Sequence, residues 1–229
     1  READNVIYTW AGPEISVTST KAYTVQISLI YLLAIRMALL CGKLSEAEAR
    51  AYTEKLYNDM PRVIEETIKT EDDIRAAAAD FANYEDLFFI GRGIDYFLSM
   101  EGSLKLKEIS YIHSEAYAAG ELKHGTISLI EDGTLVVALG TYKPLFEKTL
   151  SNIIEVKARG ADIVALTAES KAADMRKTAE NVLSVPDTHV ILQPSLGVIP
   201  LQLFAYYVAL HKGCDIDKPR NLAKSVTVE

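Results

Sequence analysis

The sequence predicts an α/β protein with a doubly wound, flavodoxin-like parallel sheet, helices on both faces, and a mostly helical N-terminal segment. Beyond about residue 82, short apolar runs rich in β-branched residues alternate with helical patterns. Strands whose apolar residues follow one another almost without interruption are typical of parallel sheets covered on both faces. Right-handed crossovers between such strands give a doubly wound sandwich. Residues 20–82 show helical patterns only.

The individual elements follow from these patterns in chain order. Strands are expected at 4–10, 86–91 ("DLFFIG"), 134–139 ("TLVVAL"), 162–167 ("DIVALT"), 181–185 ("NVLSV") and 189–192 ("HVIL"). Helices are expected at 20–41, 45–58, 60–68, 71–82, 95–113, 142–159, 170–179 and 198–213. Because no strand interrupts 20–82, the first strand is expected to belong to a preceding unit. We therefore place a domain boundary near residue 70, which gives segments 1–70 and 71–229.

Composition excludes several classes of protein. The 229 residues are 49% hydrophobic and 24% charged, as in an ordinary globular protein, and carry a formal net charge of −8. Nucleic acids and anionic membranes need clustered Lys and Arg, so neither is expected as a partner. Cys41 and Cys214 form no metal-ligand spacing. They predict a reduced, cytosolic protein without a disulfide framework and without a metal.

The most membrane-like run is "ISLIYLLAIRMALLC", residues 27–41. It is shorter than the roughly 20 residues that a spanning helix needs, and Arg36 interrupts it. We expect a buried helix or a subunit interface instead. The chain begins at Arg1 without a signal-peptide pattern, so we also expect it to be a piece of a longer polypeptide.

Three charges of the helix predicted at 95–113 lie on one line. Glu101, Lys105 and Glu108 are spaced i, i+4 and i+7, which places them within about 60° of one another on the helix surface. Apolar residues flank this line, whereas Ser103, Lys107 and Ser110 occupy the opposite, polar face. Buried charges must pair with one another or with a bound group. The pattern indicates either a proton-transfer site or a structural ion-pair network, with about equal weight.

Four further motifs have a structural and a functional interpretation. "FIGRGIDY" (89–96) is more typical of a close-packed strand-to-helix turn than of an anion site. "SVTSTKAYT" (16–24) favours hydroxyl capping of a helix over a sugar- or phosphate-binding loop at the carboxyl end of the first strand. "AAGELKHG" (118–125) places His124 in a loop, where a titratable imidazole can meet substrate. "DKPRNLAKSVTVE" is either a disordered end or a segment that carries Lys224 into a cleft.

The two long motifs "GSLKLKEISYIHSEAYAAGELKHG" and "PRNLAKSVTVE" resemble the isomerase half of the glutamine–fructose-6-phosphate aminotransferases, and "EISVTSTKAYTVQ" resembles the end of the first of that family's two sugar isomerase domains. The resemblance implies that residues 1–70 are the end of a truncated first sugar isomerase domain. Residues 71–229 would then be the second sugar isomerase domain with its C-terminal tail. The resemblance further implies amination and isomerisation of fructose 6-phosphate to glucosamine 6-phosphate, no cofactor, a homodimer, a glutaminase domain elsewhere in the longer chain, and a cytoplasmic location.

The resemblance also assigns roles to residues. The proton-transfer glutamate falls on Glu108, with Lys105 and Glu101 on the same helix face. The ring-opening histidine falls on His124, which in that family serves the neighbouring subunit's site. The lysine proposed to form a Schiff base falls on Lys224, and two sugar-contacting positions fall on Val17 and Ser19.

One feature of the family is not found. Its Ser/Thr-rich phosphate-binding loops belong to the first domain, and the counterpart here, "ALGTYKPLFEKT", has no serine cluster. We therefore expect this chain alone to bind fructose 6-phosphate weakly and to turn it over poorly. Two alternatives are a sugar-phosphate-binding regulatory module without catalysis, and a scaffold whose apolar helix at 27–41 binds a partner. The presence of Glu108, His124 and Lys224 favours the enzyme.

Overall fold

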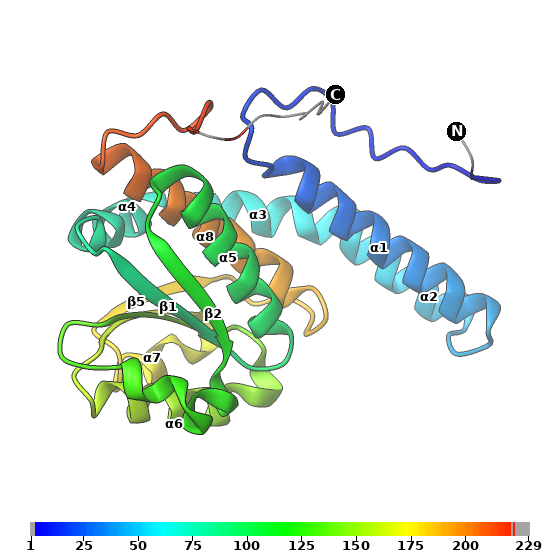
Figure 1. Ribbon diagram of the computed structural model, residues 1–229. Helices are drawn as coiled ribbons and strands as arrows, with labels where there is room; N and C mark the ends of the chain where they lie inside the picture. The colour runs from blue at the N-terminus through cyan, green and yellow to red at the C-terminus, as the bar shows by residue number, and fades with distance from the viewer. Residues whose placement is uncertain (1–2, 221, 223–229) are drawn as a thin grey trace.

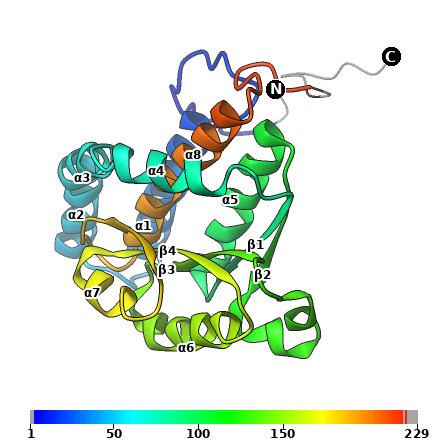
Figure 2. The same ribbon diagram turned by 90° about the vertical axis from the view of Figure 1, so that its left-hand side faces the viewer.

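The fold is a three-layer α/β sandwich around one parallel sheet, as Figures 1 and 2 show. The computed structural model describes residues 3–220 and 222. The strands are β1 (Asp86–Gly91), β2 (His113–Ala118), β3 (Leu135–Gly140), β4 (Asp162–Ala168) and β5 (Asn181–Val185). They pair in the order β2-β1-β3-β4-β5, and every pair is parallel. This order is that of flavodoxin-like proteins, so the predicted fold class is confirmed.

Helices cover both faces of the sheet because neighbouring strand residues point to opposite sides. On β1, Phe89 packs with α4 (Glu71–Phe81), α5 (Ile94–Ser110) and α8 (Gln193–His211). Its neighbour Ile90 packs with α6 (Phe146–Lys157) and α7 (Ala172–Met175) on the other side. Helix α5 follows β1 and α8 follows β5, so both run from the carboxyl edge of the sheet toward its amino edge. Their close packing forms the floor of the candidate site.

The N-terminal helices extend away from the sheet (Figure 1). Helix α1 (Lys21–Leu40) lies beside α2 (Glu46–Glu54), and a π-helical turn (Lys55–Asp59) joins α2 to α3 (Met60–Ile68). The Tyr31 hydroxyl connects α1 to the sheet domain through 2.8 Å hydrogen bonds to the Ile191 carbonyl and the Ser195 hydroxyl.

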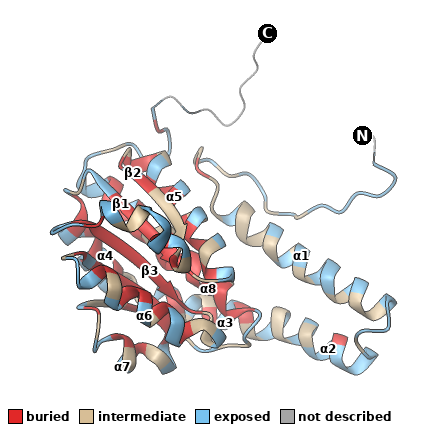
Figure 3. Ribbon diagram, turned by 60° about the horizontal axis from the view of Figure 1, so that its bottom comes forward, coloured by how far each residue is buried: buried red, intermediate tan, exposed pale blue. Residues whose placement is uncertain are grey.

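The prediction of a buried helix at 27–41 is wrong for helix α1. It has no buried residue, and its surface is exposed or intermediate along its whole length (Figure 3). By length and composition alone α1 could cross a membrane. The same properties describe a helix that is covered by other parts of a longer protein, and the alternative of a subunit interface stays a prediction.

Two of the predicted strands are wrong. Residues 4–10 form no strand: Trp10 is 90% exposed with a φ of 54°, because no neighbouring strand is available to pair with this run. Residues 189–192 form a turn that leads into α8. Conversely, β2 was missed, since the predicted helix at 95–113 ends at Ser110 and Tyr111 adopts the left-handed conformation. The domain division near residue 70 stays a prediction.

Several helices also differ from their predicted ranges. The helix predicted at 170–179 shortens to α7, preceded by a 3-10 turn (Glu169–Lys171). A 3-10 turn (Lys143–Leu145) likewise precedes α6. The segment expected as a loop at 118–125 consists largely of a 3-10 helix (Ala119–His124), and another follows at Thr126–Leu129.

Candidate active site

The charged row of α5 faces inward, as its spacing predicted. Lys105 is only 4% exposed. Its Nζ lies 2.8 Å from Oε2 of Glu108 and 3.6 Å from Oε1 of Glu101. The carboxylate side chains are themselves mostly buried, with exposures of 13% for Glu101 and 23% for Glu108. One ammonium therefore lies between two carboxylates in a region of low solvent access.

This environment changes the proton affinity of Glu101. Burial raises the pKa of its carboxyl because the charged form loses hydration, and the Lys105 ammonium opposes that rise. Tyr23 of α1 lies close enough to respond: burial raises the pKa of its hydroxyl, and the negative charge of Glu101 raises it further. The charge of the α5 row thus acts on a residue of the N-terminal segment.

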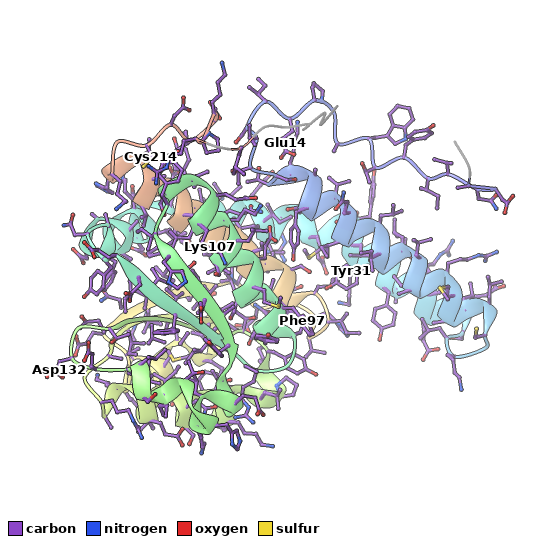
Figure 4. All side chains as sticks on the ribbon, viewed as in Figure 1. Glu14, Tyr31, Phe97, Lys107, Asp132 and Cys214 are labelled. Carbon is purple, nitrogen blue, oxygen red and sulfur yellow. The ribbon has the colours of Figure 1, made fainter. Side chains whose placement is uncertain are left out.

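The predicted polar face of α5 is only partly polar surface. Ser103 and Ser110 are buried, whereas Lys107 is exposed; Figure 4 labels it on α5. The Ser103 hydroxyl lies 2.9 Å from the Ser114 hydroxyl of β2. Ser103 and Ser114 therefore join α5 to β2, the edge strand that was not predicted from the sequence.

A cavity of about 210 Å³ adjoins the row at Lys105. Helices α5 and α8 form one side of it, and residues 16–20 with the segment after α8 form the other. Two hydrogen bonds close these segments together: the Val17 N–H donates to the Asp217 carbonyl (3.0 Å), and the Ser16 hydroxyl donates to the Ile216 carbonyl (3.2 Å). Residues about 200 positions apart in the chain thus enclose one space.

The two predicted sugar contacts lie in this N-terminal loop. Val17 is held by its bond to Asp217, and the Ser19 hydroxyl donates to Oε2 of Glu14 at 3.2 Å. The prediction that hydroxyl groups cap α1 is wrong, because Thr20 makes no side-chain cap. Glu14 caps the helix instead, accepting the N–H groups of Thr20 (2.8 Å) and Lys21 (3.0 Å); Figure 4 labels it in the loop before α1.

His124 lies at the other end of α5. It follows β2 at the carboxyl edge of the sheet, where α5 begins, and its side chain is 75% exposed. Glu108 is 14 residues further along the helix than Ile94, or about 21 Å at 1.5 Å per residue. A single chain therefore does not bring the His124 imidazole to the Glu108 carboxylate.

Lys224 lies outside the described residues, but the segment leading to it is tied to α5. The Arg220 N–H donates to the Tyr111 hydroxyl at 2.8 Å. The Arg220 guanidinium lies 4.2 Å from the centre of the same ring. Tyr111 comes three residues after Glu108, so the chain passes the end of the charged row shortly before Lys224.

The carboxyl edge of the sheet, where open α/β sheets usually bind ligands, is filled by a buried polar cluster. Asp95 is 1% exposed and accepts hydrogen bonds from the Thr141 hydroxyl (2.5 Å) and the Tyr142 N–H (2.9 Å). Burial raises the pKa of the Asp95 carboxyl against these two bonds. Asp95 was not among the predicted site residues, because its partners lie about 46 positions away in the sequence.

The glycine turn at this edge is close-packed, as predicted. A Cβ on Gly91 would lie 2.5 Å from the backbone of Asp95, and Gly93 has a φ of +57°. Across residues 3–220 and 222, no group of three or more His, Cys, Asp or Glu side chains is arranged to hold a metal ion. Cys41 and Cys214 are both free thiols.

Comparison with known proteins identifies the family to which this fold belongs. A family model described as the SIS domain matches residues 80–212, and the chain belongs to that family. The resemblance stated above is also confirmed. The whole chain is 54% identical to a glutamine–fructose-6-phosphate aminotransferase (isomerizing) of Caldanaerobacter subterraneus subsp. tengcongensis and spans 37% of that protein's length. It corresponds to the isomerase portion of these aminotransferases.

Solved structures agree with this assignment. The C-terminal domain of glucosamine-fructose-6-phosphate aminotransferase from Francisella tularensis has a TM-score of 0.84 and 38% identity, covering 90% of this chain and 58% of that one. A glucosamine-6-phosphate deaminase from Thermotoga maritima has a TM-score of 0.66 over 94% of this chain and 59% of its own, at 23% identity. The second likeness shows the shared fold alone.

Proposed function

We propose that this chain carries the proton-transfer part of a centre that converts fructose 6-phosphate and ammonia to glucosamine 6-phosphate. The observation that supports it best is the burial of Lys105 between Glu101 and Glu108 beside a cavity. A carboxylate that is shielded from water and held near a cation is suited to proton transfer next to a carbonyl or imine carbon. The protein is a cytoplasmic enzyme, and a glutaminase domain elsewhere in the longer chain supplies the ammonia.

In the proposed reaction, the Lys224 amine adds at C2 of the open-chain ketose and water leaves, giving a Schiff base; ammonia then adds at C2 and the lysine amine leaves, giving an imine. The Glu108 carboxylate takes a proton from C1, the electron pair of that C–H bond forms the C1–C2 double bond, and the C2–N π pair moves to the nitrogen, which takes up a proton to give an enolamine. The same group returns a proton to C2, while the C1 hydroxyl loses a proton as C1 becomes the aldehyde, which balances the proton taken up by the nitrogen. The Lys105 ammonium balances the negative charge of Glu108, and Glu101, on the other side of Lys105, helps to fix the position of that ammonium. Val17 and Ser19 contact the sugar.

The other two catalytic residues, His124 and Lys224, do not come from α5. His124 is supplied by a neighbouring subunit, and Lys224 by the segment that follows α8. His124 opens the sugar ring in a neighbouring subunit of a homodimer, which agrees with its position far from Glu108 in its own chain. Lys224 forms the Schiff base with the open ketose. Lys224 comes four positions after Arg220, and four extended residues span at most about 14 Å.

The phosphate is held by the part of the longer chain that precedes this one. In this chain the corresponding position is Thr141, which is fully buried and donates its hydroxyl to Asp95. Neither group is free to bind a phosphate there. The isolated chain is therefore expected to bind fructose 6-phosphate weakly, and its turnover with ammonia is expected to be poor.

The test is a chimera in which this chain replaces the matching 37% of the Caldanaerobacter aminotransferase. The chimera should form glucosamine 6-phosphate, and Glu108→Gln should lower kcat at least about 100-fold, the usual contribution of a general acid–base group. Glu131→Gln, a change in an exposed carboxylate away from the row, is the matched control and should leave kcat unchanged. A chimera that folds and binds fructose 6-phosphate without turnover supports the alternative of a regulatory sugar-phosphate module.

A further inference from the structure

The 3-10 helix that ends at His124 (Ala119–His124) is buried on one side and open to solvent on the other. Ala119 is fully buried and Leu122 is 1% exposed, and both pack in the same hydrophobic cluster as Ile153 of α6. The His124 side chain is 75% exposed, and its Nε2 lies 3.8 Å from a carboxylate oxygen of Glu121, which is itself 72% exposed. An exposed ion pair restrains its side chains weakly. The position of the imidazole therefore depends mainly on how the backbone of this 3-10 helix is held.

A chain of polar contacts connects this 3-10 helix to α6 and to the turn between β1 and α5. In that turn, Nη1 of Arg92 donates to Oδ1 of Asn152 at 2.7 Å. Nδ2 of Asn152 donates to Oε2 of Glu155 at 3.2 Å, and Oε1 of Glu155 accepts from Nζ of Lys123 at 2.9 Å. These four residues form the Arg92 network. Its last member, Lys123, directly precedes His124 in the chain.

The first member of the network also contacts the 3-10 helix. The Arg92 guanidinium packs on Gly120, where a Cβ would lie 2.9 Å from Nη2 and 3.0 Å from Nη1. A side chain at position 120 would therefore displace the guanidinium. Arg92 holds the beginning of the 3-10 helix and Lys123 holds its end, so the two contacts together fix both its place and its direction.

The hydrogen-bonding groups of the network match in one arrangement only. Asn152 is 2% exposed, and its amide must direct its oxygen to the guanidinium of Arg92 and its nitrogen to the carboxylate of Glu155. The hydrogen bond from Lys123 lowers the pKa of the Glu155 carboxyl against the opposing effect of burial, and Asn152 adds to the lowering. The carboxylate is therefore ionised at neutral pH, where charge-assisted hydrogen bonds are stronger than neutral ones.

We propose that the Arg92 network positions His124, holding the 3-10 helix so that the imidazole is presented outward to the charged row of a neighbouring subunit. The inference rests on the proposed function, in which His124 opens the sugar ring, and adds how a side chain so exposed in its own chain is kept in place. Catalytic groups need such support, because a displacement of about 1 Å can lower a rate on the order of 100-fold.

The first experiment measures amide hydrogen exchange in the 229-residue chain. Lys123→Met and Asn152→Ala should each make exchange over residues 119–125 several-fold faster while exchange in β3 stays unchanged. Lys123 is 57% exposed, so its replacement leaves the core intact. Unchanged exchange over 119–125 in both variants would overturn the inference.

Two further variants serve as controls for Lys123→Met. Lys123→Arg keeps a positive charge and hydrogen-bond donors for Glu155, and exchange over 119–125 should return to the wild-type rate. Lys157→Met is the matched change on α6, since Lys157 is exposed and pairs with Glu180 at 3.6 Å, outside the network. It should leave exchange over 119–125 at the wild-type rate. Faster exchange in Lys157→Met than in Lys123→Met would contradict the assignment.

The second experiment uses the chimera and two substrates, fructose 6-phosphate and 5-deoxyfructose 6-phosphate. The second sugar lacks the C5 hydroxyl that closes the ring, so it needs no ring opening. Lys123→Met and Asn152→Ala should lower kcat/KM for fructose 6-phosphate about tenfold or more, and that for the open-chain analogue less than about twofold. Equal losses on both substrates would mean that the network serves only the fold, and would overturn the inference.

A double variant tests whether the network acts through the imidazole. Lys123→Met combined with His124→Gln should be no slower on fructose 6-phosphate than His124→Gln alone, because a positioning residue has nothing left to position. A further loss of about tenfold in the double variant would contradict the inference.

The two proposals fail separately. An active chimera in which both network variants match the wild type on fructose 6-phosphate overturns the positioning role and leaves the proposed function intact. A wild-type chimera that folds but turns over neither sugar overturns the proposed function. The exchange rates over residues 119–125 then still decide whether the Arg92 network holds the 3-10 helix.

Discussion

Arg220 and Tyr111 hold each other through two contacts. The Arg220 N–H donates to the Tyr111 hydroxyl at 2.8 Å, and the Arg220 guanidinium lies 4.2 Å from the centre of the tyrosine ring. Tyr111 ends α5 with a φ of 62°, a conformation that bulky residues rarely adopt and that glycine usually provides at helix ends. The cost of this conformation indicates that the side chain is needed where it lies.

Tyr111→Phe is therefore expected to loosen the chain after α8 without unfolding the domain. The variant keeps the ring under the guanidinium but removes the hydroxyl that accepts the Arg220 N–H, a bond worth about 0.5–1.5 kcal/mol. Amide hydrogen exchange at Arg220 should become several-fold faster, while exchange in β3 stays unchanged. Unchanged exchange at Arg220 would show that the hydroxyl does not hold this segment.

The charged row of α5 predicts how the stability of a Lys105 variant changes with pH. Lys105→Met leaves the carboxylates of Glu101 and Glu108 without their cation, and the chain should lose about 1–3 kcal/mol at pH 7.5, discounted because Glu108 is partly exposed. Without the ammonium that opposes it, the burial-raised pKa of Glu101 rises further. A carboxyl whose pKa is raised by folding stabilises the fold when protonated, and this contribution is lost as pH rises through the folded-state pKa.

The deficit of Lys105→Met should therefore shrink between pH 7.5 and pH 5, as measured by urea unfolding at both values. Lys107→Met is the matched control, since Lys107 is exposed on the same helix, and it should change stability by less than about 0.5 kcal/mol. A deficit that grows toward pH 5 would contradict the assigned direction.

How far the sequence predicts this protein depends on how local the determining contacts are. β1, β3 and β4 were found because their apolar residues run almost continuously, which burial on both faces requires. The edge strand β5, "NVLSV", is only partly buried and was found from its run of Val and Leu. β2 was missed because it is an edge strand of mixed polarity, "HSEAYA", with one fully buried residue. The apolar run at 4–10 was wrongly predicted as a strand, because its composition suits a strand but a strand also needs a neighbouring strand to pair with.

The site divides in the same way. The inward orientation of Glu101, Lys105 and Glu108 follows from helical spacing alone. The cavity does not, because the loop at 16–20, α8 and the segment after it meet only through the tertiary fold. Asp95 likewise becomes informative only once Thr141 lies beside it.

The strand-to-helix turn offers a test by a single methyl group. Gly91→Ala would place a Cβ 2.5 Å from the backbone of Asp95 in the first turn of α5, where no flexible side chain can move away. The expected loss is about 2 kcal/mol or more. Gly197→Ala in α8 is the control: its nearest neighbour would be at 3.4 Å, and alanine favours a helix by about 1 kcal/mol over glycine. Equal stability of the two variants in urea unfolding would contradict the close packing of this turn.

Two tyrosines predict how the fold responds to alkali. The Tyr207 hydroxyl donates to Glu71, joining α8 to α4, and this bond raises the pKa of Tyr207 to about 12, with burial and the charge of Glu71 adding to the rise. Burial and the bond to Asp162 raise the pKa of Tyr84 to about 12 as well. The unfolded chain releases these protons near pH 10, so the stabilisation is complete below pH 10 and is lost between pH 10 and 12.

Urea unfolding at pH 9 and pH 11 should show a steep loss for the wild type, a shallower one for Tyr207→Phe, and the shallowest for Tyr207→Phe combined with Tyr84→Phe. If all three chains lose stability equally over this interval, these two hydroxyl groups do not carry the alkaline response, and their bonds to Glu71 and Asp162 do not hold the proton in the folded state.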